Sequence, residues 1–220
     1  MPIDPLSAET RLYHLRELGL VDYLETWQRM MAFTERRTPE TVDEIWFLEH
    51  PPVYTLGLNG RREHVLDPGD IPVIQVDRGG QITYHGPGQL VVYPLLDMKR
   101  LGLGPRGLVR ILEGATVDCL SEFGIHAHAR PEAPGVYVET RKIASIGLRI
   151  RRGGSYHGLA FNISVDLGPF RGINPCGYQG LEMTRLMDLG GPSTLDAVMP
   201  VLGKHLERWI KERSGLPSRA

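Results

Sequence analysis

The chain has 220 residues, 41% hydrophobic and 23% charged, a balance typical of a globular protein with a substantial core. Its 25 basic and 26 acidic residues give no overall field that would indicate nucleic acid as a partner. Two cysteines and no signal-peptide pattern argue against a secreted, disulfide-bonded protein, and no apolar run approaches the roughly 20 residues of a membrane span. We therefore expect a soluble, cytoplasmic protein.

The N-terminal part of the chain predicts a strand and a helix. Residues 1–10 show no periodicity and are interpreted as a loose lead-in, and residues 12–18 are expected to form a short strand. Apolar residues at helical spacing predict a helix over residues 20–37. Its methionine pair, Met30 and Met31, could line a ligand site, but such a pair on an apolar helix face more often fills the core, and we assign it to the core.

The middle of the chain predicts a sheet. Runs rich in β-branched and aromatic residues predict strands over residues 44–49, 53–57, 71–76, 81–84, 136–138, 142–150 and 158–165. The apolar run over residues 90–96 predicts a strand buried on both faces. Residues 142–150 and 158–165 alternate apolar side chains, as a strand with one buried face does. The sheet is therefore expected to be mainly antiparallel or mixed.

Two further helices complete the pattern. The apolar stripe of residues 106–123 predicts a helix that contains Cys119, which makes Cys119 the structural cysteine. Ser193 and Asp196 resemble a capping box at the start of a closing helix. No repeat or long linker divides the chain, so a single α+β domain is expected over residues 1–220.

Cys176 lies between Pro175 and Gly177 in a loop rather than in an apolar periodic segment. Proline fixes backbone φ and glycine accepts positive φ, so we expect the thiol to be displayed on a rigid kink instead of packed in the core. A thiol reacts as its thiolate, which requires a nearby cation or base. Lys142 is the best candidate, although a lysine on an apolar strand is more often an ordinary edge-strand residue.

Residues 78–89 hold four glycines interleaved with hydrogen-bond donors, so backbone N–H groups could approach a ligand closely. On glycine count alone, a turn between strands with a solvated Arg78 is an equally good interpretation. The adjacent Tyr84 and His85 favour a binding loop. Neither the P-loop pattern nor the dinucleotide fingerprint occurs, so nucleotide binding lacks support from the sequence.

Histidines form a further set of candidates. His157 precedes Gly158 at the expected mouth of a strand, but a single histidine there is more often a hydrogen-bonded structural group than a base, and we assign it no chemistry. His50, His64 and His85 are also candidates. Because the eight histidines show no metal-ligand spacing, no metal site is expected.

Five motifs resemble the octanoyltransferase (LipB, lipoyl-protein transferase) family in their order, and together they span most of the chain. They are residues 49–57, 78–89, 142–147, 157–160 and 174–177. The resemblance implies the catalytic fold of biotin and lipoate protein ligases, with a mixed central sheet flanked by helices. It also implies transfer of an octanoyl group from octanoyl-acyl carrier protein to a lysine of lipoyl domains, such as those of 2-oxoacid dehydrogenase E2 subunits and glycine cleavage protein H, without ATP or a cofactor.

Carried over residue by residue, the resemblance makes Cys176 the nucleophile that forms an acyl thioester. Lys142 would favour its thiolate and shuttle protons, and Gly177 with neighbouring backbone N–H groups would stabilise the oxyanion. Phe161 stands where the family pattern has leucine and would alter one wall of the acyl tunnel. The tunnel would be lined by Arg78, Gly79, Gly80, Gln81, Ile82, Thr83, Tyr84, His85, Ser145, Ile146, Gly147, Gly158, Leu159 and Ala160.

Two alternatives to this interpretation are considered. An ATP-dependent lipoate or biotin ligase shares the fold, but it would carry a serine before three glycines and His-Asp after the loop, whereas here Arg78 precedes two glycines and Gly86 follows His85. A ligase would also leave Cys176 without a role. A non-catalytic protein that sequesters acyl chains or lipoyl domains would acquire no covalent acyl group.

A cluster of arginines completes the candidate surface. Charge runs are mostly solvated faces, but the partners implied by the resemblance are acidic, so these arginines are expected to form a docking patch. The arginines are Arg61, Arg62, Arg149, Arg151 and Arg152.

Overall fold

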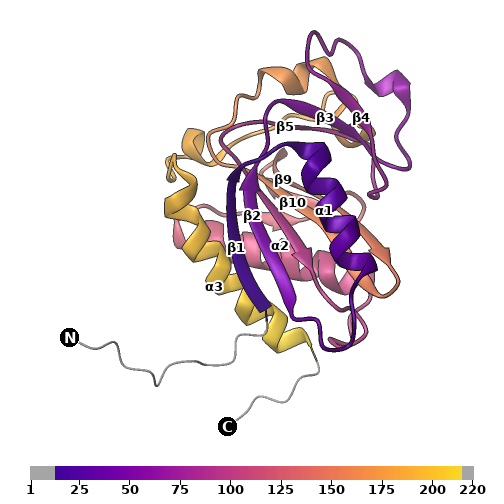
Figure 1. Cartoon of the computed structure of the whole chain (residues 1–220). Coiled ribbons are helices and arrows are strands. Elements are labelled where there is room, and N and C mark those ends of the chain that lie inside the picture. Colours follow the sequence, from indigo (N-terminus) through magenta and orange to yellow (C-terminus); the bar gives the residue numbers. More distant parts are fainter. Residues whose placement is uncertain (1–12, 215–220) are drawn as a thin grey trace, which may run out of the picture.

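A seven-stranded sheet forms the centre of the computed structural model, which describes residues 13–214 (Figure 1). Its strands, from one edge to the other, are β1 (Tyr13–Leu20), β2 (Asp43–Glu49), β6 (Gln89–Leu95), β10 (Gly154–Asn162), β9 (Arg141–Arg151), β8 (Gly135–Val138) and β7 (His128–Ala129). β1 and β2 run parallel and the other neighbours antiparallel, so the prediction of a mixed sheet is confirmed.

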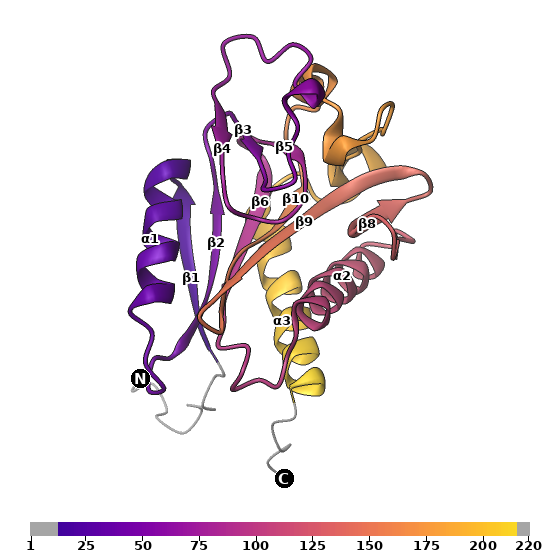
Figure 2. The same cartoon turned by 90° about the vertical axis from the view of Figure 1, so that its right-hand side faces the viewer.

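Three helices cover the two faces of this sheet. Helix α1 (Tyr23–Glu35) lies on one face, and α2 (Pro105–Glu122) and α3 (Leu195–Arg213) lie together on the other (Figure 2). Helix α1 connects β1 to β2, because two parallel strands need a crossover of this kind. Asp22 caps α1 by accepting a hydrogen bond from the N–H of Glu25. The α+β fold with helices on both sides agrees with expectation.

Alternate side chains of the central strands pack into two separate hydrophobic cores, one on each face of the sheet. In β2, Ile45 and Phe47 face α2 and α3, whereas Trp46 and Leu48 face α1. Strand β6 divides its side chains in the same way, so all of its residues are buried. This explains why the run of residues 90–96 is apolar without alternation, as expected of a strand covered on both faces.

A second, three-stranded sheet was not foreseen from the sequence. It consists of β4 (Val73–Gln75), β3 (Val53–Leu56) and β5 (Ile82–His85), in that order. Pro51 and Pro52 separate β2 from β3, so consecutive strands enter different sheets. The remaining elements are the short 3₁₀ helices η1 (Arg62–His64), η2 (Gly168–Gly172), η3 (Pro175–Gly177) and η4 (Leu186–Leu189).

Several local expectations were wrong. The first helix begins at Tyr23, because Leu20 still belongs to β1. Strand β10 begins at Gly154, not at residue 158, and all of its residues are buried, so buried and exposed side chains do not alternate along it. The capping box at Ser193 does not form, since the N-cap residue of α3 is Thr194 and no side chain caps the helix. The expected lead-in over residues 1–10 lies outside the described range.

Cys119 and Met30 are both core residues, as expected, and lie on helices that cover opposite faces of the sheet. Cys119 is fully buried on α2, where burial raises the pKa of its thiol to about 12. Met30 is fully buried on α1, and Met31 packs against the same core from a half-buried position. Within residues 13–214, no helix is long and apolar enough to cross a membrane.

Two helical glycines test the packing of α2 on α3. A Cβ at Gly114 would lie 2.3 Å from the ring of Trp209, whereas a Cβ at Gly203 would lie 3.9 Å from a ring carbon of Phe47. We expect Gly114→Ala to lower the free energy of unfolding by about 1–3 kcal/mol through overpacking. Gly203→Ala should raise it by up to about 1 kcal/mol, because alanine is the better helix former. Urea unfolding checks both; equal stability of the two variants would contradict this packing.

Candidate active site

Cys176 occupies the centre of η3 with a positive φ of 55°, and the following Gly177 has a φ of 79°. A left-handed backbone is uncommon for a residue other than glycine and persists only where the surroundings impose it. Here the N–H of Asn174 donates to the carbonyl of His64 at 2.9 Å, and Gly177 packs beside the His64 ring. The half-buried thiol is thus held on a kink.

Lys142 reaches the thiol from the neighbouring strand β9. Its ammonium Nζ donates to Cys176 Sγ at 3.2 Å and to the carbonyl of Pro134 at 2.8 Å, and lies 5.3 Å from the ring centroid of Tyr137. Lys142 is only 1% exposed, so it is not the solvated edge-strand lysine of the alternative interpretation. Burial acts to lower the pKa of Lys142, but attraction to Cys176 and Tyr137 outweighs it and the pKa is raised.

The backbone of Lys142 is paired with the chain that follows the cysteine. Its N–H donates to the carbonyl of Glu182 and its carbonyl accepts from the N–H of Thr184, both at 2.9 Å, in a parallel bridge centred on Met183. The loop that carries Cys176 therefore returns to the lysine that contacts it.

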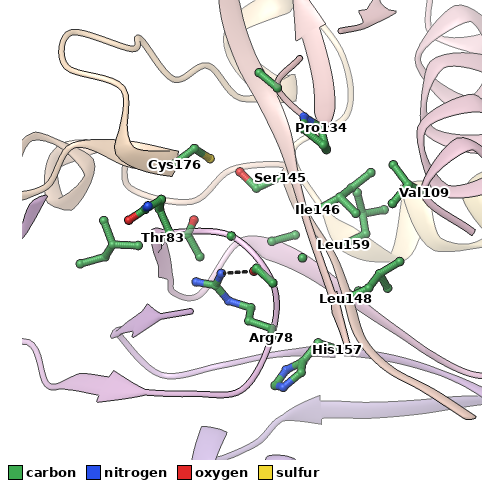
Figure 3. A pocket seen from close by; sticks show the side chains of 18 of the residues that line it. Arg78, Thr83, Val109, Pro134, Ser145, Ile146, Leu148, His157, Leu159 and Cys176 are labelled. Atoms are coloured by element: carbon green, nitrogen blue, oxygen red, sulfur yellow. Dashed lines mark hydrogen bonds between the residues drawn. The ribbon is translucent and has the colours of Figure 1, made fainter. Parts of the chain in front are cut away.

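A cavity of about 540 Å³ opens beside this pair. In Figure 3 the apolar side chains of Val109, Ile146 and Leu159 gather on one side, while Arg78 and His157 lie at the bottom. Of the residues expected to line a tunnel, the cavity is lined by Arg78, Gly79, Gly80, Gln81, Ile82, Thr83, His85, Ser145, Ile146, Gly147, Gly158, Leu159 and Ala160, together with Lys142 and Cys176. The arrangement combines an apolar chamber with a thiol at its wall.

Tyr84 and Phe161 do not line this cavity. Side chains alternate along β5, so Tyr84 points away from the face of Thr83 and His85 and packs against Phe170, with ring centroids 5.4 Å apart. Phe161 is fully buried in the core between the sheet and the helices α2 and α3. Its difference from the family pattern therefore does not shape a cavity wall.

Glycines allow the 78–80 loop to lie directly against other backbone. The N–H of Gly79 donates to the carbonyl of Leu148 at 2.9 Å, and a Cβ at Gly147 would come within 3.0 Å of the Gly79 carbonyl. A Cβ at Gly57 would lie only 2.4 Å from the Gly80 carbonyl. These contacts fix the loop as a cavity wall, so Gly57 and Gly147 serve close packing of the loop against neighbouring backbone.

Arg78 is a buried cation in the cavity wall. Its guanidinium donates to the carbonyl of Thr55 at 2.6 Å, to the Thr55 hydroxyl and to the carbonyl of Gly79 at 2.9 Å. Burial lowers the pKa of Arg78, against the attraction of Tyr23 and Cys176. Because its contacts are to neutral groups, Arg78 supplies positive charge to the chamber without a paired carboxylate in the described residues.

Three buried histidines belong to hydrogen-bonded networks at the cavity, and two of them, His85 and His157, line it. His50 contacts the Tyr93 hydroxyl at 2.8 Å and His157 contacts Asp77 at 3.0 Å. Burial lowers the pKa of His50 to about 4 and that of His85 well below its usual value. Burial also lowers the pKa of His157, although Asp77 opposes the shift. Neutral, engaged imidazoles of this kind fit a structural role.

Two of the expected oxyanion donors are already occupied. The N–H of Gly177 donates to the carbonyl of Asn174 at 2.9 Å, and the N–H of Tyr178 donates to the carbonyl of Pro175 at 3.0 Å. Both bonds close the η3 turn that presents Cys176. Gly177 therefore supports the shape of the loop rather than offering a free donor.

Several lining residues were missed in the sequence. They are Tyr23, Asn59, Val91, Tyr93, Pro105, Val109, Glu132, Ala133, Pro134, Leu148, His157 and Tyr178. Pro134 and Gly135 form a dipeptide typical of turns, which could have marked the segment opposite Cys176. Tyr23 and Tyr93 carried no comparable signal, because each sits in an ordinary apolar run.

The five arginines lie on different segments, with Arg61 and Arg62 at η1 and the other three at the end of β9. The backbone of Arg61 contacts Gln81 in the cavity wall, which places η1 near Cys176. Arg149 and Arg151 lie about 23 and 30 Å from Lys142 along β9, from the rise of a strand. Arg151 also pairs with Glu35 at 3.0 Å. The docking surface expected for these arginines stays a prediction.

Comparisons with known proteins agree with this architecture. The family model of the lipoyl protein ligase A/B catalytic domain matches residues 22–207. An octanoyltransferase of Alkalilimnicola ehrlichii is 58% identical over 212 residues, covering 96% of this chain and 97% of that relative. An octanoyltransferase of Xanthomonas campestris is 56% identical, covering 94% of this chain and 87% of the relative.

Solved structures give the same fold at low sequence identity. A lipoate-protein ligase A bound with ATP superposes with a TM-score of 0.75 at 15% identity, covering 90% of this chain and 85% of the other. A biotin protein ligase from Aquifex aeolicus gives a TM-score of 0.57 at 15% identity, covering 91% and 70%. These two likenesses show the fold alone. The relatives of high identity and full coverage show more: the chain belongs to the octanoyltransferase family, acyltransferases built on the lipoyl protein ligase A/B catalytic domain.

Proposed function

We propose that this enzyme transfers an octanoyl group from octanoyl-acyl carrier protein to the lysine of lipoyl domains through a thioester on Cys176. The acceptors are the lipoyl domains of 2-oxoacid dehydrogenase E2 subunits and glycine cleavage protein H, and the setting is the cytoplasm. The contact of Lys142 Nζ with Cys176 Sγ at 3.2 Å, on the wall of a largely apolar cavity, is the observation that carries the proposal.

In the first half-reaction, the Cys176 thiolate attacks the carrier thioester and the carbon–sulfur bond to the carrier breaks. The carrier leaves as a thiolate and takes a proton from the Lys142 ammonium, which becomes a neutral amine. Acylation removes the negative charge that holds this proton. Burial, which acts to lower the pKa of Lys142, then favours the neutral amine.

In the second half-reaction, the acceptor lysine attacks the thioester after losing one proton to solvent. Its nitrogen gives a second proton to the neutral Lys142 as the amide forms, and Cys176 leaves as a thiolate. The ammonium–thiolate pair is restored. Exchange of one thioester for another is nearly balanced, whereas amide formation is favourable, so the reaction needs no ATP.

Replacing the nucleophile tests this mechanism most directly. After incubation with octanoyl-carrier protein and no acceptor, intact-protein mass should show one hydroxylamine-labile octanoyl adduct, absent in Cys176→Ala. Cys119→Ala is the matched control and should keep the adduct, because Cys119 is buried in the core. Near-normal transfer by Cys176→Ala, or a requirement for octanoate and ATP, would replace this mechanism with that of a ligase.

Lys142→Ala should slow both half-reactions by about 10²–10⁴-fold, the usual contribution of a positioned acid or base. Single-turnover formation and decay of the adduct measure the two steps separately. Circular dichroism should show a folded protein, since Lys142 and Pro134 both line the cavity and water can enter the space that the lysine leaves. Loss of only one step would limit Lys142 to that step.

The apolar wall predicts a preference for medium chains. An octanoyl tail has six methylenes more than an acetyl group, worth on the order of 5 kcal/mol if all are buried. Competition between acetyl-, octanoyl- and palmitoyl-carrier protein should therefore favour octanoyl strongly. Equal rates for acetyl and octanoyl donors would mean that the chain does not enter the cavity.

A further inference from the structure

The segment opposite Cys176 is held by side chains at four successive residues. The carbonyls of Glu132, Ala133 and Pro134 accept hydrogen bonds from the Tyr178 hydroxyl at 3.3 Å, the Tyr137 hydroxyl at 2.9 Å and Lys142 Nζ at 2.8 Å. The N–H of the next residue, Gly135, donates to Glu113 Oε1 at 3.0 Å. The carbonyl that holds the lysine therefore lies between two further side-chain anchors.

Glu113 reaches this segment from α2, on the far side of the segment from Cys176. Gly135 is tightly enclosed, because a Cβ there would lie 2.5 Å from Lys142 Cε and 2.4 Å from the Ala144 carbonyl. The backbone must therefore stay close to the lysine side chain. The bond from Gly135 to Glu113 fixes the peptide unit that begins with the Pro134 carbonyl.

We propose that Glu113 is a positioning residue for the reaction: by holding the N–H of Gly135, it keeps the Pro134 carbonyl in place and so holds Lys142 Nζ on Cys176 Sγ. The inference rests on the roles proposed above for Lys142 and Cys176. Glu113 acts through the peptide between residues 134 and 135 and does not line the cavity itself. Misplacement by about 1 Å is enough to cost on the order of 10²-fold in rate.

The pKa of the Glu113 carboxyl is set by burial and by the groups around it. Burial raises the pKa of Glu113, against the Gly135 hydrogen bond and the cations Lys142 and Arg110. Groups on other elements that interact electrostatically with Lys142 or Cys176 include Glu113 on α2, Tyr137 on β8 and Arg78 before β5, and Glu132 and Tyr178 also line the cavity. Glu113 could act through its hydrogen bond with Gly135 or through its charge, so the variants must change one without the other.

Three substitutions make that separation. Glu113→Ala removes both acceptor and charge, Glu113→Gln restores an acceptor of the same reach without charge, and Glu113→Asp restores the charge on a shorter side chain that cannot reach Gly135. Acylation by octanoyl-carrier protein should fall about 10²-fold in the Ala and Asp variants, and the Gln variant should recover most of this loss. Glu122→Ala is the control on the same helix, since Glu122 binds Lys204 and His205 away from the site.

Alkylation of Cys176 by iodoacetamide supplies a readout that needs no acyl donor. The rate near pH 7 divided by the rate near pH 10, where thiols are largely ionised, reports the thiolate fraction corrected for access. The ratio should fall in Glu113→Asp but not in Glu122→Ala. Thermal unfolding identifies any variant that fails to fold. If Glu113→Ala fails to fold, the comparison of Glu113→Gln with Glu113→Asp tests the inference alone.

Two results would overturn the inference. A Glu113→Asp variant with unchanged acylation and unchanged alkylation ratio would show that the contact is dispensable. A slow Gln variant beside a normal Asp variant would show that charge, not contact, matters. If the wild-type protein forms no acyl adduct, the proposed function fails, while the alkylation ratio still decides whether Glu113 positions Lys142.

Discussion

The contact between a buried ammonium and a thiol governs the organisation of this site. A charged lysine that is 1% exposed needs partners to offset the loss of water, and Lys142 finds them in a carbonyl, an aromatic ring and Cys176. Each partner comes from a different element: the segment before β8, β8 itself and η3. The surrounding fold can be understood as the framework that brings these elements to one point.

Close backbone packing gives the cavity its walls. The 78–80 loop crosses the end of β9 and rests on Gly147 and Leu148, which is feasible only because Cβ atoms are absent at the crossing. The small sheet that contains β3 and β5 supplies the opposite support through Thr55, which binds the Arg78 guanidinium. Glycine at these positions is thus a requirement of the chamber's shape.

Periodicity predicted the three helices and most strands, and the family resemblance supplied a part of the residues that line the cavity beside Cys176. Local patterns could not assign strands to sheets, because pairing depends on contacts between distant segments. The consecutive strands β2 and β3, for example, belong to different sheets. Alternation within β5 could have excluded Tyr84 from the cavity, had the direction of one side chain been known. The segment around Pro134 and the contact with Glu113 depend on tertiary geometry that no local pattern encodes.

The parallel bridge between Lys142 and Met183 ties Lys142 and Cys176 into one closed length of chain. Because the residues on either side of Met183 bind both backbone groups of Lys142, the thiol loop cannot swing away from the lysine without breaking this pair. Local opening of the site is then a cooperative event, which must disrupt the strand and the loop together. The contact between Lys142 Nζ and Cys176 Sγ therefore lasts as long as the backbone hydrogen bonds that hold the two segments together.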